Sequence, residues 1–118
     1  MAEIIKADFT NRRKDTMTVA IGTEENPIEL SILPPTKGTM DKLVSIAGYI
    51  ELAMRGEDIE GFDYSECLSL AAEVMSNNTM LMQITPEYLE SIKFDMIDVS
   101  DFVALYLHFV TKLVESKN

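Results

Sequence analysis

Three consecutive segments near the C-terminus set the architecture of this chain: SECLSLAAEVMSN (65–77), ITPEYL (84–89) and VSDFVALYLHFVTKLVE (99–115). The first and third carry apolar residues at helical spacing, and the second has the composition of a helix start. Thr85 is a suitable N-cap, Pro86 fits the first turn, and Glu87 faces the positive end of the helix dipole. The pattern predicts two helices joined by a short helical turn, with no recognisable reactive centre.

A further helix is predicted over residues 39–55, with Thr39 as its N-cap and Gly56 as its stop. Its apolar stripe consists of Met40, Leu43, Val44, Ala47, Ile50 and Met54. Inside a helix, Gly48 costs about 1 kcal/mol of stability relative to Ala. We interpret this glycine as a position that allows close approach by another element. Asp63 and Glu66 have capping-box spacing and are expected to open the helix that follows.

Residues 16–33 have a different, alternating pattern. Ile28, Leu30 and Ile32 fall on one face of a strand, and a turn-like segment at 22–27 separates them from a β-branched run. The sequence therefore predicts a mainly α fold: a small helical domain of about four helices with a short N-terminal β-hairpin. We expect a single domain over 1–118, made of an exposed arm (1–15), the hairpin (16–33) and the helical part (39–117).

The last helix is apolar on two faces, so it is either buried centrally or shared with a partner. One stripe consists of Phe102, Leu105, Tyr106, Phe109 and Leu113, and the other of Val103, Leu107, Val110 and Val114. We predict the first stripe, with Tyr88 and Leu89 nearby, as a partner-binding face; the alternative is that the same residues are core. A lone hairpin is only marginally stable, which together with this two-faced helix favours self-association.

The net charge of -10 excludes some partners. Residues 39–118 hold fourteen of the twenty acids but only five of the ten bases. Such a surface repels phosphate backbones and anionic lipids, so nucleic acid and membrane are not expected as partners. The basic cluster in residues 11–15 could touch nucleic acid, form a solvated turn, or pair with acids of the same or a neighbouring chain. No signal peptide or membrane span is recognisable, which predicts a cytoplasmic protein.

No catalytic or metal site is predicted. Cys67 is the only cysteine and lies in an apolar helical run, where a buried thiol behaves as a small hydrophobe. His108 is the only histidine and no nucleophile motif accompanies it. The acidic run over residues 57–66 lacks the spacing of a calcium loop and is predicted to be a solvated loop. We therefore expect no enzyme activity, no cofactor and no metal.

The chain also resembles a known family. The segments Glu73–Asn78 and Ile84–Leu89, followed by a hydrophobic helix, resemble the tail assembly chaperones of long-tailed bacteriophages and prophages. The run Ile28–Leu33 followed by a helix is similar to the start of those proteins, so the resemblance covers roughly residues 28–115. The basic arm and Pro34-Pro35 have no counterpart in that pattern.

The resemblance implies a function by contact. Members of that family bind the long helical tape measure protein, keep it soluble and help to recruit tail tube subunits around it. The tape measure protein and the tail tube protein are therefore the expected partners, in the cytoplasm of a bacterial host. The competing hypothesis is a small acidic phage protein that acts as a regulator or inhibitor, or mimics nucleic acid, through the acids of residues 57–66. A small enzyme dependent on His108 or Cys67 is a third class.

Overall fold

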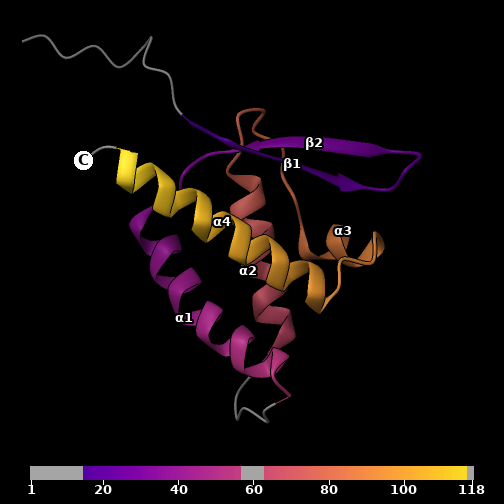
Figure 1. The fold of residues 1–118 in the computed structure, drawn as a ribbon. Helices are drawn as coiled ribbons and strands as arrows, with labels where there is room; N and C mark the ends of the chain where they lie inside the picture. The colour runs from indigo at the N-terminus through magenta and orange to yellow at the C-terminus, as the bar shows by residue number, and fades with distance from the viewer. Residues whose placement is uncertain (1–14, 57–62, 117–118) are drawn as a thin grey trace, which may run out of the picture.

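A computed structural model describes residues 15–56 and 63–116 of the chain, with only the backbone of Met54 and Ser116. Within these residues an antiparallel hairpin precedes four helices, which confirms the predicted mainly α fold (Figure 1). The elements are β1 (Met17–Gly22), β2 (Pro27–Ile32), α1 (Lys37–Met54), α2 (Tyr64–Ser76), α3 (Pro86–Ser91) and α4 (Met96–Ser116). Most of the predicted arm and most of the acidic loop lie outside the described residues.

The hairpin has the predicted strands in an unbroken register, from Met17 opposite Ile32 to Gly22 opposite Pro27. Thr23 and Asn26 flank the turn and exchange backbone hydrogen bonds with N···O distances of 3.4 and 3.2 Å. Alternation places the side chains of Leu30 and Ile32 in the core, as expected for a strand with one buried face.

Helix α1 begins two residues before the predicted start. Thr36, not Thr39, is the N-cap, because its hydroxyl accepts a hydrogen bond from the Thr39 amide at 3.2 Å. Thr36 directly follows Pro34-Pro35, which cannot supply helical amide donors, so the helix starts at the first residue after the prolines that can cap it. The predicted stop is confirmed: Gly56 has a φ of +83° and donates to the Ala53 carbonyl.

The predicted apolar stripe of α1 is only partly buried, and one expectation for this helix is wrong. Leu43 and Ile50 are in the core, whereas Val44 of the same stripe is 60% exposed. Gly48 lies on the exposed side of the helix, and among the described residues no atom beyond its chain neighbours and the adjacent helix backbone comes within 4 Å of where its Cβ would be. The glycine therefore allows no close approach by another described element.

Helix α2 is the centre of the domain and contacts α1, α3, α4 and β2. Its start is as predicted, since Asp63 accepts a hydrogen bond from the Ser65 amide at 2.8 Å. Its core-facing side chains are buried: Cys67, Leu68, Leu70, Ala71, Ala72, Val74 and Met75. In Figure 1, α4 crosses in front of α2 and the hairpin lies across one end of the helices.

The segment after α2 joins it to the hairpin. The Asn77 carbonyl accepts from the Leu33 amide at 2.8 Å, and the Thr79 amide donates to the Ser31 carbonyl at 3.0 Å. Asn78 is buried, and its side-chain amide accepts from the Met80 and Met82 amides and donates to the Met75 and Met82 carbonyls. This side chain satisfies the backbone of a tight loop in which Leu81 has a φ of +56°.

The last two helices begin at side-chain caps. Thr85 accepts from the Tyr88 amide at 3.0 Å, which confirms the predicted start of α3. Helix α4 begins at Met96, three residues before the predicted start, because Asp95 and Asp98 form a reciprocal cap. Each carboxylate accepts from the backbone amide of the other residue at 3.0 Å. None of the described helices is long and apolar enough to cross a membrane.

Candidate partner-binding surface

Three of the seven predicted contact residues lie in the core. Phe102, Tyr106 and Leu89 are buried, and the rings of Phe102 and Tyr106 stack with centroids 6.1 Å apart. The Tyr106 hydroxyl donates to the Leu33 carbonyl at 2.7 Å, which ties α4 to the end of the hairpin. Burial raises the pKa of this phenol above its ordinary value, because the ionised form would lose its hydration. These side chains stabilise the domain and are covered by it.

The other four predicted residues do not form one surface. Leu105 is 60% exposed, whereas Phe109, Leu113 and Tyr88 are half-buried. Phe109 packs on Tyr106 with ring centroids 5.9 Å apart. Tyr88 lies at the hairpin, where its hydroxyl would be 3.3 Å from a Cβ placed on Gly22. The predicted face is thus divided between the core, the outer side of α4 and the hairpin.

An apolar depression lies instead between α1 and α4, where the second stripe of α4 faces α1. It has two hollows of about 560 and 320 Å³. The larger lies between Ala47 and Ile50 of α1 and Val103 and Leu107 of α4. The smaller lies between the start of α1 and the end of α4, and the predicted residue Leu113 lines it. The two helices therefore run antiparallel along one depression.

We call this surface the α1–α4 seam and define it by residues Met40, Val44, Ala47, Leu107, Val110 and Val114. Met40, Val44 and Ala47 recur at helical spacing, so they fall on one side of α1. Leu107, Val110 and Val114 do the same on α4. Val44 and Val114 are 60% and 59% exposed, so the seam presents apolar side chains at the surface. The signal for it in the sequence was the second stripe of α4.

Charged residues flank the seam. Glu51 and Arg55 lie beside the larger hollow and form an exposed ion pair with an N···O distance of 2.6 Å. Lys37 and Asp41 lie beside the smaller one. An exposed ion pair of this kind contributes less than about 1 kcal/mol to stability. These side chains can therefore leave one ion pair and form another at little cost in free energy.

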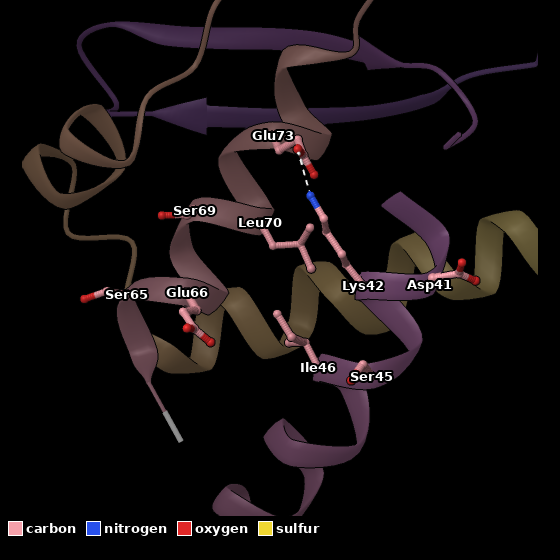
Figure 2. Close-up of a pocket in the computed structure, with 9 residues that line it drawn as sticks. All are labelled: Asp41, Lys42, Ser45, Ile46, Ser65, Glu66, Ser69, Leu70 and Glu73. Atoms are coloured by element: carbon pink, nitrogen blue, oxygen red, sulfur yellow. Dashed lines mark hydrogen bonds and ion pairs between the residues drawn. The ribbon is translucent and has the colours of Figure 1, made fainter. Parts of the chain in front are cut away.

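A second groove, of about 650 Å³, lies between α1 and α2 (Figure 2). Ile46 and Leu70 point toward one another across it. Lys42 of α1 reaches Glu73 of α2 with an N···O distance of 3.5 Å. Asp41, Glu66 and Glu73 give this groove three acids against one base. Seven of its nine lining residues are charged or serine, so this groove offers more polar side chains than the seam and suits a cationic group.

Cys67 and His108, the two groups considered for chemistry that the structure describes, lie in different environments. Cys67 is buried, and burial raises the pKa of its thiol, which disfavours the nucleophilic thiolate. His108 is exposed on α4. In the described part of the chain no three His, Cys, Asp or Glu side chains are grouped so that they could hold a metal ion. Of the acidic run, residues 57–62 lie outside the described residues, and Asp63 caps α2.

Comparison with known proteins adds no assignment. No protein-family model matches the chain, and no curated protein or solved structure is significantly similar to it.

Proposed function

We propose that this protein is a bacteriophage tail assembly chaperone that holds a helical segment of the tape measure protein in the α1–α4 seam and helps to recruit tail tube subunits. The observation that carries the proposal is the open apolar seam. Val114 is exposed at the smaller hollow, and Val44 is exposed on α1 between Met40 and Ala47, which line the two hollows. The resemblance of residues 28–115 to that family supplies the partner.

The shape of the surface between α1 and α4 suits a helix. The two hollows are lined by residues from Lys37 at the start of α1 to Arg55 at its C-cap, so together they extend along about 27 Å of this helix, which matches five turns of a partner helix. A helix laid over two antiparallel helices buries its own apolar stripe against both of them. A tape measure protein is a long amphipathic helix before it is sheathed, so its exposed stripe requires such a cover.

The charge of the protein suits the same role. A net charge of -10 keeps a complex with an apolar helix soluble and attracts segments that carry basic residues. Four acids line the grooves on the two sides of α1: Asp41, Glu51, Glu66 and Glu73. Apolar contact supplies the affinity in this proposal, and the net negative charge of the protein favours basic segments over acidic ones.

Co-expression tests the proposal. The chain is expressed with the tape measure protein that the proposal assigns to it as partner, and the amount that co-purifies is measured for the natural chain and for Val44→Glu with Val114→Glu. Both valines are exposed, so the two substitutions place charge in the seam without burying that charge in the domain. We expect at least a tenfold loss of complex, which corresponds to about 1.4 kcal/mol of binding free energy.

Leu105→Glu is the matched control, because Leu105 is as exposed as Val44 but lies outside the seam. We expect this variant to retain the complex. Circular dichroism of each purified variant establishes that the fold is kept. Full binding by the seam variant, or equal loss in the control, would contradict the seam as the docking site. No complex with the natural chain would contradict the proposed function itself.

A further inference from the structure

The groove between α1 and α2 has an apolar floor with an acid toward each end. The floor is made by Ile46, which is half-buried, and Leu70, which is 5% exposed, and these side chains point toward one another (Figure 2). Glu66 lies four residues before Leu70 and Glu73 three residues after it, so all three fall on one face of α2. Both glutamates are exposed, which leaves their carboxylates accessible from solvent.

The charges that face this groove are fewer than those that line it. In Figure 2, Ser65 and Ser69 point away from α1, and Asp41 points away from α2. The two glutamates of α2 and Lys42 of α1 remain, which is two acids against one base. The groove of about 650 Å³ is therefore negative and open, and its volume lies in the range of binding pockets.

Lys42 shows how the groove holds a cation. Its Nζ atom lies 3.5 Å from Oε1 of Glu73, and the two side chains are 61% and 46% exposed. An exposed ion pair at this distance contributes little to stability, so another cation can displace Lys42 at low cost. Among residues 15–56 and 63–116, Glu66 forms no ion pair. One acid of the groove is thus weakly paired and the other is available.

We propose that the α1–α2 groove docks a helical segment of another protein that carries two basic residues seven positions apart with an apolar residue between them. Seven residues are two helical turns, about 10 Å, so bases at this spacing match Glu66 and Glu73, which are also seven residues apart. The apolar residue rests on Ile46 and Leu70. The stems of the basic side chains extend over the same floor while their charged ends reach the carboxylates, and one of them replaces Lys42 at Glu73.

Charge selects a partner other than a second copy. Helix α1 carries Lys37 and Lys42, which are five residues apart, and α4 carries Lys112, whereas α2 and α3 contain no lysine or arginine. The described helices of this chain therefore lack two bases at the required spacing. A net charge of -10 on each copy also opposes the approach of a second copy to an acidic groove. The complementary occupant is a basic, amphipathic helix.

This inference does not depend on the proposed chaperone function. The groove lies between α1 and α2, whereas the seam lies between α1 and α4, so the two surfaces are on different sides of α1. The seam takes an apolar stripe, and the groove takes a pair of bases. Binding at the groove is measured with a synthetic peptide and not with the tape measure protein, so either proposal can fail while the other holds.

A peptide of defined spacing tests the occupant. The probe is an alanine-rich helical peptide with two lysines seven positions apart and leucines three and four positions after the first lysine, so that it fits the groove in either direction. The control peptide has the same composition, but its second lysine is two positions nearer the first, which puts the lysines on different faces. By fluorescence anisotropy with the full chain at low ionic strength, we expect the probe to bind at least about threefold more tightly than the control. Equal binding of the two peptides, or no binding of the probe, overturns the proposal.

Matched substitutions test the groove. We expect Glu66→Gln and Glu73→Gln each to raise the Kd of the probe about threefold, because each removes one carboxylate that pairs with a lysine. Lys42→Met keeps the stem but removes the competing cation, so we expect it to lower the Kd about threefold. Glu90→Gln and Lys112→Met change the net charge by the same amounts at exposed positions outside the groove, and we expect them to alter the Kd much less.

The place of binding is measured on the natural chain, so it does not depend on how the variants fold. We expect the probe to shift the methyl NMR signals of Ile46 and Leu70 and to leave those of Val114 unchanged. Effects of the two control substitutions as large as those of their groove counterparts would show that the peptide responds to net charge, and they would overturn the proposal. Shifts at Val114 without shifts at Ile46 would place the peptide in the seam and would overturn it as well.

Discussion

At the residue scale, Asn78 is the side chain on which the loop after α2 depends. Replacing it with Ala would leave the Met80 and Met82 amides without their acceptor, and it would remove a donor from two carbonyls. Because the site is buried, water cannot replace these hydrogen bonds without a cost in free energy. We expect Asn78→Ala to lower the free energy of unfolding by about 2–4 kcal/mol, measured by urea denaturation.

Asn77→Ala is the comparison for this prediction. Asn77 is only partly buried, and its side chain makes one hydrogen bond, to the Pro34 carbonyl at 3.1 Å. We expect a loss of about 1 kcal/mol. Equal effects of the two substitutions would mean that the buried network of Asn78 contributes no more than a single surface-facing bond.

At the element scale, two glycines have opposite roles. Gly48 lies inside α1, and no described atom beyond its chain neighbours and the adjacent helix backbone comes within 4 Å of the position that a Cβ would take. Ala therefore fits there and favours the helix. We expect Gly48→Ala to raise the free energy of unfolding by about 0.5–1 kcal/mol, seen as a higher Tm.

Gly22→Ala provides the contrast. Gly22 has a φ of +100°, and a Cβ there would lie 2.5 Å from the Asn26 carbonyl oxygen. The substitution is therefore strained, and we expect it to lower Tm. If Gly48→Ala were as destabilising as Gly22→Ala, α1 would have a neighbour in solution that the described residues do not supply.

At the scale of the whole molecule, the helices differ in how completely they are packed. Helix α2 buries seven side chains, whereas among the described side chains of α1 only Leu43 and Ile50 are in the core, and a groove lies on each side of this helix. Local opening requires less free energy where fewer apolar contacts are broken. We expect amide hydrogen exchange to be faster in α1 than in α2, and a helix bound in the seam to slow the exchange of α1. Equal protection of both helices in the unbound protein would contradict this expectation.

Much of the fold could be predicted because its signals are local. The Asp63 and Thr85 caps, the Gly56 stop and the alternation of Ile28, Leu30 and Ile32 each depend on residues a few positions apart. The errors in the helix starts were also local, and each arose from competing caps. Thr36 and Thr39 are equally good caps by type, and proximity to Pro35 decided between them. The Asp95–Asp98 pair was not recognised as the start of α4.

The candidate site could be predicted only in part. The sequence by itself determined a mainly α domain with a hairpin, an acidic surface and a last helix with two apolar stripes. Only the tertiary structure decided which residues of each stripe are covered, because both stripes are apolar and have helical periodicity. The Leu33 carbonyl accepts a hydrogen bond from the Tyr106 hydroxyl and α2 packs against α4, so Phe102 and Tyr106 turn inward. The second stripe meets α1: its first residue, Val103, is buried, whereas Val114 at its end stays exposed, so the seam remains open at the surface.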